Sequence, residues 1–404
     1  MNKNTNPQNF EVADPYGILY LLPPPKPWKA TEWYSTSIAG MPLLLRNILT
    51  LQRSGLHNLT LFIDAEETEK LALLVEKNSR ITAKINWITK PEQLKETLQN
   101  RKSRILFFNG SALHDKKEVR FLYEAEKTKT PEVLPISSDQ LESLIEKIQL
   151  NSEKELRETF ESESAILYVP GAEQNQIQEP KDFNTLHEQL LKGSGQNHDS
   201  TITRFLSRPV SRKLTRFFLN TPITPNQITL FSFAVGLGSA LCFAQGTYQM
   251  NLTGALLLLF STWVDGADGE IARLKFMETE LGGKLDIACD NIVHFFVFGA
   301  IGLGVSEATG DKTYMYVGGL AAFASLTSFI LLGASLIKKS STSLPESQSS
   351  LADKLANRDF IHFLMLMALI DLVNVFIFIT AGGATIFATY LIYLRIVAKS
   401  PAHA

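Results

Sequence analysis

Four aspartates lie in the apolar C-terminal half of the 404-residue sequence: Asp265, Asp268, Asp286 and Asp290. The first two are three positions apart and the last two are four apart, so each pair lies on one face of a helix. A carboxylate at membrane depth is costly unless it is paired or bound to a metal. Oxygen ligands favour hard cations, so the pattern predicts Mg²⁺ or Mn²⁺. Two such ions close together would suit phosphoryl transfer.

Small residues surround the first pair of aspartates. Gly266, Gly269 and Ala272 lack bulk, so a flat or phosphate-bearing ligand could approach the helix closely. Arg273 follows directly and can donate two hydrogen bonds to phosphate oxygens. The simpler alternative, a solvated acidic loop, fits poorly because the residues occupy helical spacings.

The elements that must position these residues are membrane helices. No Lys, Arg, Asp or Glu occurs between Phe217 and Val264, which a soluble domain rarely shows. We expect six spans, at about 224–246, 250–270, 284–305, 313–337, 358–371 and 373–396. The boundary between the last two spans is the least distinct.

The cationic residues predict how these spans are oriented. With the N-terminus inside, the outer loops hold only Lys312. The inner side then holds Arg273, Lys275, Lys284, Lys338, Lys339, Lys354, Arg358, Arg395 and Lys399. This bias predicts an inner-membrane protein with both termini and the aspartates on the cytoplasmic side.

A basic segment precedes the first span. Residues 201–220 carry Arg204, Arg208, Arg212, Lys213 and Arg216 among leucines and phenylalanines. Cations on one face and apolar residues on the other predict an interfacial helix on anionic lipid. A basic linker helix is the alternative.

The N-terminal half predicts a separate α/β domain with a mostly parallel sheet. Short apolar runs at 17–22, 59–63, 85–88 and 104–108 alternate with helical stretches at 42–54 and 92–101. We expect a disordered lead at 1–14, the α/β domain at 15–192 and a linker at 193–200. The lead has no apolar core typical of a signal peptide, so we expect this half to remain in the cytoplasm.

Overall composition excludes several classes of function. The formal net charge of −2 gives no support to nucleic-acid binding as the main task. The only cysteines, Cys242 and Cys289, fall in apolar segments and offer neither a disulfide framework nor a cysteine zinc site.

The aspartate region resembles the CDP-alcohol phosphotransferase family. Asp265 to Arg273, then Gly282, Asp286 and Asp290, fill every position of the signature D-x2-D-G-x2-A-R-x8-G-x3-D-x3-D. The resemblance implies a six-helix membrane domain over 221–398, a homodimer, and transfer of a substituted phosphate from a CDP-alcohol to a hydroxyl acceptor with release of CMP. The donor would be of the CDP-inositol or CDP-diacylglycerol type, and the acceptor inositol phosphate, glycerol phosphate or another polyol.

The same resemblance implies roles for individual residues. Asp265, Asp268, Asp286 and Asp290 would bind two divalent ions, and Asp290 would also be the catalytic base. The CDP surface would comprise Gly269, Ala272, Arg273 and Gly282, with Asn226 and Thr229 as weaker candidates.

Several other polar residues have two interpretations. Lys338, Lys339 and Arg358 are weak candidates for binding an acceptor phosphate, and the alternative is that they only anchor the topology. We expect His294 to be packed or hydrogen-bonded, with an acceptor contact as the alternative. Glu278 and Glu280 are expected in a solvated turn.

The N-terminal half resembles sugar-phosphate nucleotidyltransferases more weakly, through Ile38–Arg46, Ser54-Gly55, Phe62-Ile63 and Leu106–Gly110. The order of the two domains resembles that of bifunctional inositol-1-phosphate cytidylyltransferase and di-myo-inositol-phosphate-phosphate synthases. However, prolines fill the loop at 21–28, where backbone N–H groups should hold a triphosphate. Ser111 stands where a metal-binding aspartate is expected, and Asp115 comes four residues late. We therefore predict that this domain does not make a CDP-alcohol.

Three alternatives to a phosphotransferase with an inactive N-terminal domain remain at this point. The N-terminal domain could also synthesise the CDP-alcohol, which would make the chain bifunctional. A cation transporter would need carboxylates at mid-membrane and an internal repeat, and no repeat is visible. A non-enzymatic membrane anchor would not need an intact signature.

Overall fold

The computed structural model describes residues 14–63, 68–99, 105–127, 166–195, 203–338 and 359–397. The predicted lead, apart from Asp14, and most of the predicted linker fall outside these ranges. The chain divides into two compact units, residues 1–190 and 191–404.

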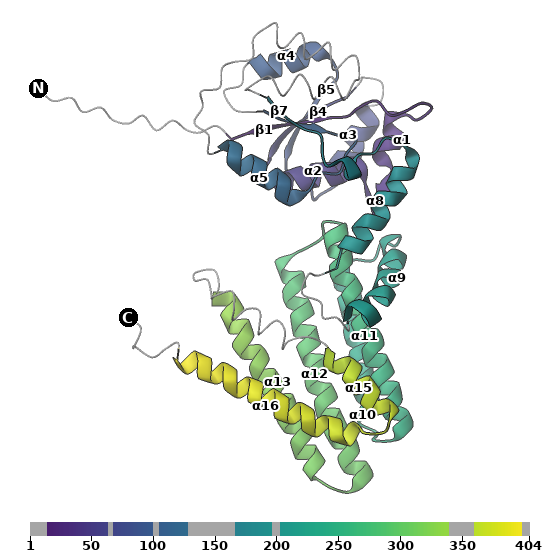
Figure 1. The fold of residues 1–404 in the computed structure, drawn as a ribbon, viewed down its shortest axis with the longest axis vertical. Helices are drawn as coiled ribbons and strands as arrows, with labels where there is room; N and C mark the ends of the chain where they lie inside the picture. Colours follow the sequence, from purple (N-terminus) through teal and green to yellow (C-terminus); the bar gives the residue numbers. More distant parts are fainter. Residues whose placement is uncertain are drawn as a thin grey trace, which may run out of the picture. The chain divides into compact units, whose positions relative to one another are not determined.

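The N-terminal unit is built on a five-stranded sheet in which every neighbouring pair is parallel (Figure 1). The strand order is β5-β4-β1-β6-β7, so the chain starts in the middle and moves outward to each edge in turn. The strands are β1 (Tyr16–Tyr20), β4 (Asn58–Phe62), β5 (Lys84–Ile88), β6 (Ile105–Asn109) and β7 (Ile166–Val169), with a small antiparallel pair β2 (Ser37–Ile38) and β3 (Met41–Pro42). The parallel α/β class predicted from the sequence is confirmed.

Burial explains why these segments form strands. Every residue of β1 and β6 is buried, as expected for central strands covered on both faces. The helices are α1 (Ala30–Ser35), α2 (Leu43–Arg53), α3 (Thr68–Glu76), α4 (Pro91–Gln99), α5 (Lys116–Lys127) and α8 (Pro180–Gly193). Helix α2 begins after Pro42, and Gly55, with a φ of 113°, follows its end.

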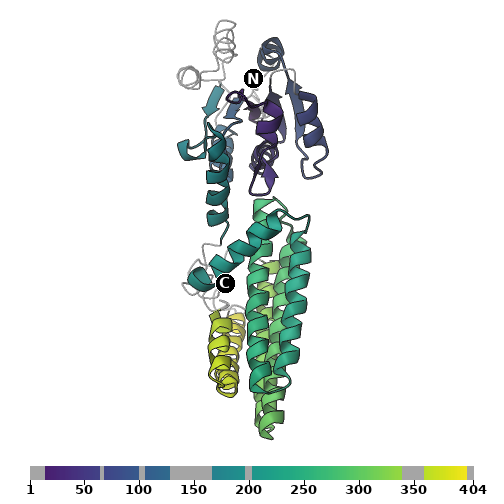
Figure 2. The same cartoon turned by 90° about the vertical axis from the view of Figure 1, so that its right-hand side faces the viewer.

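The second unit is helical. It comprises a π-helical turn η3 (Thr203–Ser207) and helices α9 (Arg208–Leu219), α10 (Pro225–Phe243), α11 (Tyr248–Leu274), α12 (Glu280–Thr309), α13 (Thr313–Lys338), α15 (Asp359–Leu369) and α16 (Val373–Val397) (Figure 2). Helix α10 packs along α11 and α12, and α13 packs along α12 and α16. All six expected spans are therefore helical, and a turn with Asp371 at a φ of 58° separates the last two.

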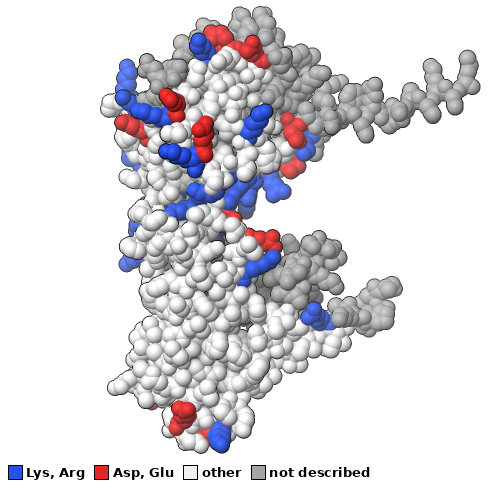
Figure 3. All heavy atoms as spheres, turned by 180° about the vertical axis from the view of Figure 1, so that it is seen from behind, with Lys and Arg blue, Asp and Glu red and all other residues white. Residues whose placement is uncertain are grey.

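Length and composition distinguish these helices. Within the described residues, four are long and apolar enough to cross a membrane: Pro225–Phe243, Glu280–Thr309, Thr313–Leu331 and Val373–Ile396. Helix α15 is apolar but short, and α11 carries the acidic residues of the signature near its C-terminal end. The face drawn in Figure 3 shows almost no charged side chains along the flank of this unit.

The predicted basic helix at 201–220 differs from the expectation in two ways. The regular α-helix begins only at Arg208, followed by Pro209, whose fixed φ suits a first turn. Its buried side chains are Ser211, Thr215 and Leu219, whereas Phe217 is exposed. The side chain of Arg208 is largely buried, unlike the solvent-facing cations expected for this helix, because it pairs with the buried Glu270.

Candidate metal and phosphate site

Two neighbouring helices bring three of the four aspartates together. Asp265 comes from α11, and Asp286 and Asp290 come from the first turns of α12. One carboxylate oxygen from each lies within 4.8 Å of the others. Asp265 is buried and the other two are half-buried, so the group is partly shielded from solvent.

Hydroxyl groups from α10 hold the carboxylates of α11. Ser232 donates a hydrogen bond of 3.3 Å to Asp265, and Thr229 donates one to Asp268. Asp268 is buried but is not a member of the three-carboxylate group. The structure therefore gives Thr229 a direct link to a predicted ligand.

Caps fix where the site helices begin. The Thr279 hydroxyl accepts a hydrogen bond of 3.0 Å from the Gly282 N–H, so α12 starts immediately after it. A Cβ on Gly282 would lie 2.9 Å from the Thr279 hydroxyl and 3.0 Å from the Asn226 side-chain oxygen. A side chain at position 282 would therefore have to displace Thr279 or Asn226 where the start of α12 meets the start of α10. Gly282 and Asn226, both predicted to contact CDP, thus lie next to each other.

Arg273 lies on a different face of α11 from the aspartates. Its Nε and Nη2 donate hydrogen bonds of 3.0 and 2.7 Å to the Ser194 carbonyl oxygen. A Cβ on Gly269 would lie 3.3 Å from Nη1 of Arg273, so the glycine leaves room for the guanidinium. The guanidinium does not point into the three-carboxylate group in this structure; Ala272 beside it is half-buried.

Residues 222–390 match the family model described as CDP-alcohol phosphatidyltransferase. The matched region runs from just before α10 into α16. A protein from Archaeoglobus fulgidus named bifunctional IPC transferase and DIPP synthase is 34% identical over 142 residues, which cover 34% of this chain and 27% of that protein. A phosphatidylinositol phosphate synthase from Corynebacterium glutamicum is 35% identical over 86 residues, which cover 21% of this chain and 38% of that protein.

The match therefore spans under a third of the length of the bifunctional relative. Among solved structures, a phosphatidylinositol phosphate synthase from Mycobacterium tuberculosis with CDP-DAG bound covers 48% of this chain and 96% of its own, at 20% identity and a TM-score of 0.36.

The donor set of the three-carboxylate group fits a divalent cation. Three carboxylates within 4.8 Å repel one another strongly in a partly buried setting. A hard cation with oxygen ligands offsets this repulsion, and carboxylates are the ligands Mg²⁺ and Mn²⁺ prefer. Asp265, Asp286 and Asp290 are the residues that would hold it.

A narrow pocket adjoins Asp290. Ser232, Ser261, Thr262 and His294 contribute polar groups to its lining. His294 also lies edge-on to Phe360, with ring centroids 4.9 Å apart, and stacks on Phe298 at 6.2 Å. The packed interpretation of this histidine is confirmed, although its ring also lines the pocket.

The structure does not describe the side chains of the three predicted acceptor-binding residues. Lys339 and Arg358 lie outside the described residues, and only the backbone of Lys338 is described. Glu280 pairs with Lys284 on the surface at 2.5 Å, as expected of an exposed turn.

Sequence reasoning missed the buried Glu270 and its partners. Glu270 fills an unspecified position of the signature, so the motif gave no reason to select it. Its partners Arg208, Ser211 and Thr215 lie 55 to 62 positions away, and no local spacing links them. The one available signal was a glutamate within an apolar helix, which requires a partner.

In the N-terminal unit, the carboxyl ends of β1 and β6 form a closed polar cluster. Ser111 is buried and shares a hydrogen bond of 2.9 Å with the Tyr34 hydroxyl, which also donates to the Leu22 carbonyl at 2.8 Å. The Asn47 amide donates to the carbonyls of Gly110 and Ala112 at 3.0 and 2.9 Å. Parallel sheets commonly bind ligands at this edge, but here protein groups occupy it.

Burial also shifts the acid–base properties of this cluster. It raises the pKa of Tyr34 and lowers the pKa of His114 to about 4, although the His114 contact with the Asn109 carbonyl opposes that shift. Arg46, in the segment that resembles nucleotidyltransferases, donates to the carbonyls of Ile38 and Ala39 at 2.8 and 3.2 Å. Burial lowers the pKa of this arginine to about 10.

Proposed function

We propose that this chain is an integral-membrane phosphotransferase that moves a substituted phosphate from a CDP-alcohol to a hydroxyl acceptor. The observation that carries the proposal is the convergence of Asp265, Asp286 and Asp290 from two adjacent helices. The match of residues 222–390 to a transferase family supports the same reaction class. We include in the proposal six membrane-crossing helices, a cytoplasmic site, both termini inside and a homodimer.

The reaction needs a nucleophile, a leaving group and charge stabilisation. In the proposal, Asp290 takes the proton of the acceptor hydroxyl as its oxygen attacks the phosphorus bonded to the donor alcohol. The P–O bond to CMP breaks, and CMP departs with the electron pair. Bound Mg²⁺ or Mn²⁺, two ions in the proposal, would neutralise charge on the diphosphate.

The remaining site residues bind rather than react. Asp268 completes the proposed ligand set and is held by Thr229. Asn226 and Gly282 meet at the helix starts and would contact the donor, together with Gly269, Ala272 and Arg273. The guanidinium of Arg273 would leave the Ser194 carbonyl to bind a donor phosphate.

CMP release tests this proposal. The full chain, purified in lipid nanodiscs with Mg²⁺, is offered CDP-inositol or CDP-diacylglycerol with inositol phosphate or glycerol phosphate, and products are identified by mass spectrometry. Asp290→Asn and Asp268→Asn should abolish CMP release, whereas Glu280→Gln, on the exposed start of α12, should not change it. Full activity in both aspartate variants would refute the assigned roles.

We further propose that the N-terminal unit does not make the CDP-alcohol. Four of the eight residues at 21–28 are prolines, and the N–H groups of Leu21 and Trp28 already donate to backbone carbonyls. Ser111 supplies a hydroxyl bonded to Tyr34 where a metal-binding carboxylate would be needed. The names of the bifunctional relatives favour the opposite view, and CDP-inositol formation from CTP and inositol phosphate would establish it.

A further inference from the structure

One face of α11 is occupied by the segment that precedes the membrane helices. Trp263 donates a hydrogen bond of 3.2 Å to the Ser207 hydroxyl, and a Cβ on Gly266 would lie 3.1 Å from the Ser211 hydroxyl. Glu270 follows one turn later on the same face. This face of α11, which carries Trp263, Gly266 and Glu270, thus contacts the end of η3 and the first turns of α9 over two turns of α11.

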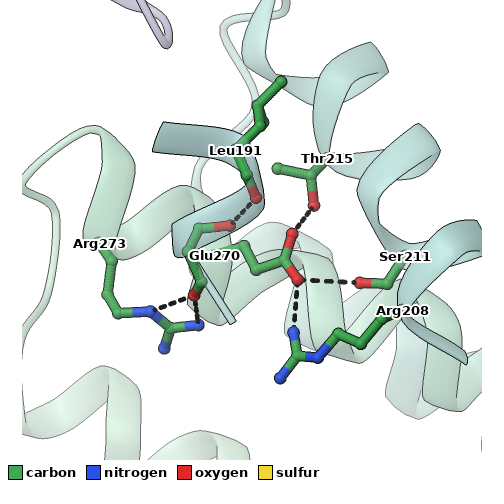
Figure 4. Close-up of polar contacts among 7 residues, drawn as sticks. Leu191, Arg208, Ser211, Thr215, Glu270 and Arg273 are labelled. Carbon is green, nitrogen blue, oxygen red and sulfur yellow. Dashed lines mark hydrogen bonds and ion pairs between the residues drawn. The ribbon is translucent and has the colours of Figure 1, made fainter. Parts of the chain in front are cut away.

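Glu270 is the centre of this contact. Its side chain is fully buried, forms an ion pair with Arg208 and accepts a hydrogen bond of 2.7 Å from the Thr215 hydroxyl (Figure 4). Ser211 adds a longer contact of 3.5 Å. Arg208 is only 12% exposed, so the pair is largely removed from water. Loss of either partner would leave the other charge buried and uncompensated.

The position of Glu270 in the signature relates it to catalysis. It comes two residues after Asp268, which places it about 200° around the helix axis, away from the metal-binding face. Glu270 therefore cannot share an ion with Asp265 and Asp268, but its anchor fixes how α11 is rotated. That rotation decides whether those two carboxylates face α10 and α12.

We propose that Glu270 is a positioning residue for the phosphotransfer reaction. By pairing with Arg208 it docks α9 on the back of α11 and holds the metal-binding face in register. This inference rests on the proposed function of the three-carboxylate site, but the docking itself can be measured without any turnover.

The kinetic test uses single and double variants of the full chain. Glu270→Gln and Arg208→Met should each lower kcat for CMP release by about a hundredfold, since small misplacements of reacting groups have effects of that size. The KM for the CDP-alcohol should change less than about threefold, because neither residue touches the donor. The double variant Arg208→Met with Glu270→Met should recover most of kcat, because an apolar pair can replace a buried ion pair.

A surface ion pair on α12 provides the matched control. Glu280 and Lys284 form a pair with side chains 83% and 60% exposed, so Glu280→Gln and Lys284→Met should leave kcat unchanged. Unchanged kcat in Glu270→Gln would overturn the proposal. A double variant no better than the single variants would also overturn it, because the two residues would then act on the substrate rather than on each other.

Cross-linking tests the docking independently of activity. A Cβ at position 266 would lie 3.7 Å from the Ser211 Cβ, which suits a disulfide. The pair Gly266→Cys and Ser211→Cys should cross-link on mild oxidation, and adding Glu270→Gln should slow the reaction about tenfold or more. An equal rate with and without Glu270 would contradict the anchoring. Cross-linking as expected in a chain that releases no CMP would retain the anchor and reject the proposed function.

Discussion

The carboxyl edge of the N-terminal sheet and the site where the end of α11 meets the start of α12 both gather polar side chains, but they do so in opposite ways. At the sheet edge, the amide of Asn47 and the hydroxyls of Ser111 and Tyr34 satisfy backbone and side-chain partners within the protein. In the helical unit, Asp265, Asp286 and Asp290 place negative charge within 4.8 Å. In the first cluster most polar groups have partners within the protein, although Asn47 Oδ1 and His114 Nδ1 are buried without one. The second cluster gains most from a cation.

This difference separates a polar structural cluster from a polar active site. Donors and acceptors that match within the protein stabilise the fold and leave little for a substrate. Carboxylates brought close together repel one another and destabilise the fold unless a cation binds them. Such a cluster therefore indicates a cation site.

Asp286→Asn should have the largest effect, because it removes one carboxylate from the three-carboxylate group. We expect CMP release to fall by about a thousandfold, or about 4 kcal/mol of transition-state stabilisation. Mn²⁺ binding, measured by electron paramagnetic resonance, should weaken in parallel. Asp311→Asn, in the exposed turn at the other end of α12, is the charge-matched control. Undiminished Mn²⁺ binding in Asp286→Asn would show that the group holds no ion.

His114 should make the N-terminal unit sensitive to acid. Burial lowers its folded-state pKa from 6.5 to about 4, so the unfolded chain binds a proton first as the pH falls. Stability should therefore be lost between about pH 6.5 and pH 4, by up to about 3 kcal/mol. Thermal unfolding of the full chain across this range would show a dependence that His114→Asn removes. The exposed His57→Asn should preserve it.

Asn47→Ala tests whether the sheet-edge cluster is structural. The substitution leaves the buried carbonyls of Gly110 and Ala112 without their side-chain donor. We expect the N-terminal unit to lose about 2 kcal/mol of stability. Differential scanning calorimetry would show a lower unfolding temperature, and Asn58→Ala, on an exposed strand end, should change it little. An unchanged unfolding temperature in Asn47→Ala would argue that the cluster is not a structural core.

The parts of the fold that follow local rules were predictable from the sequence. Buried parallel strands are short apolar runs, so β1, β4 and β6 were recognisable within one or two residues. The three-carboxylate group was also predictable from the sequence, because the spacing of Asp286 and Asp290 places both on one helix face. Short elements such as β2 and β3 were missed, since two residues carry no periodic signal.

Long-range partners were not predictable. Glu270 and Arg208 are 62 positions apart, and nothing in the sequence around either residue indicates the other. For the same reason, the sequence did not reveal that Arg208 is largely buried. The amphipathic pattern of residues 201–220 had placed it on the solvent-facing cationic side. A single buried acid on the neighbouring helix outweighed the general preference of cations for the solvent face, because an unpaired buried charge is much more costly than a desolvated but paired one.

Thr229→Val should have the smallest effect and gives the finest test of the comparison. The hydroxyl of Thr229 donates to Asp268, a proposed ligand outside the three-carboxylate group, so valine removes one charge-assisted hydrogen bond without changing the volume much. We expect kcat/KM for CMP release to fall about tenfold, or about 1.4 kcal/mol, with Mn²⁺ affinity reduced less than in Asp286→Asn. Thr253→Val is the matched control, because that exposed hydroxyl bonds only within α11, to the Gln249 carbonyl. If Thr229→Val retained full activity, Asp268 would not need a fixed orientation. The active site would then depend on the three-carboxylate group alone.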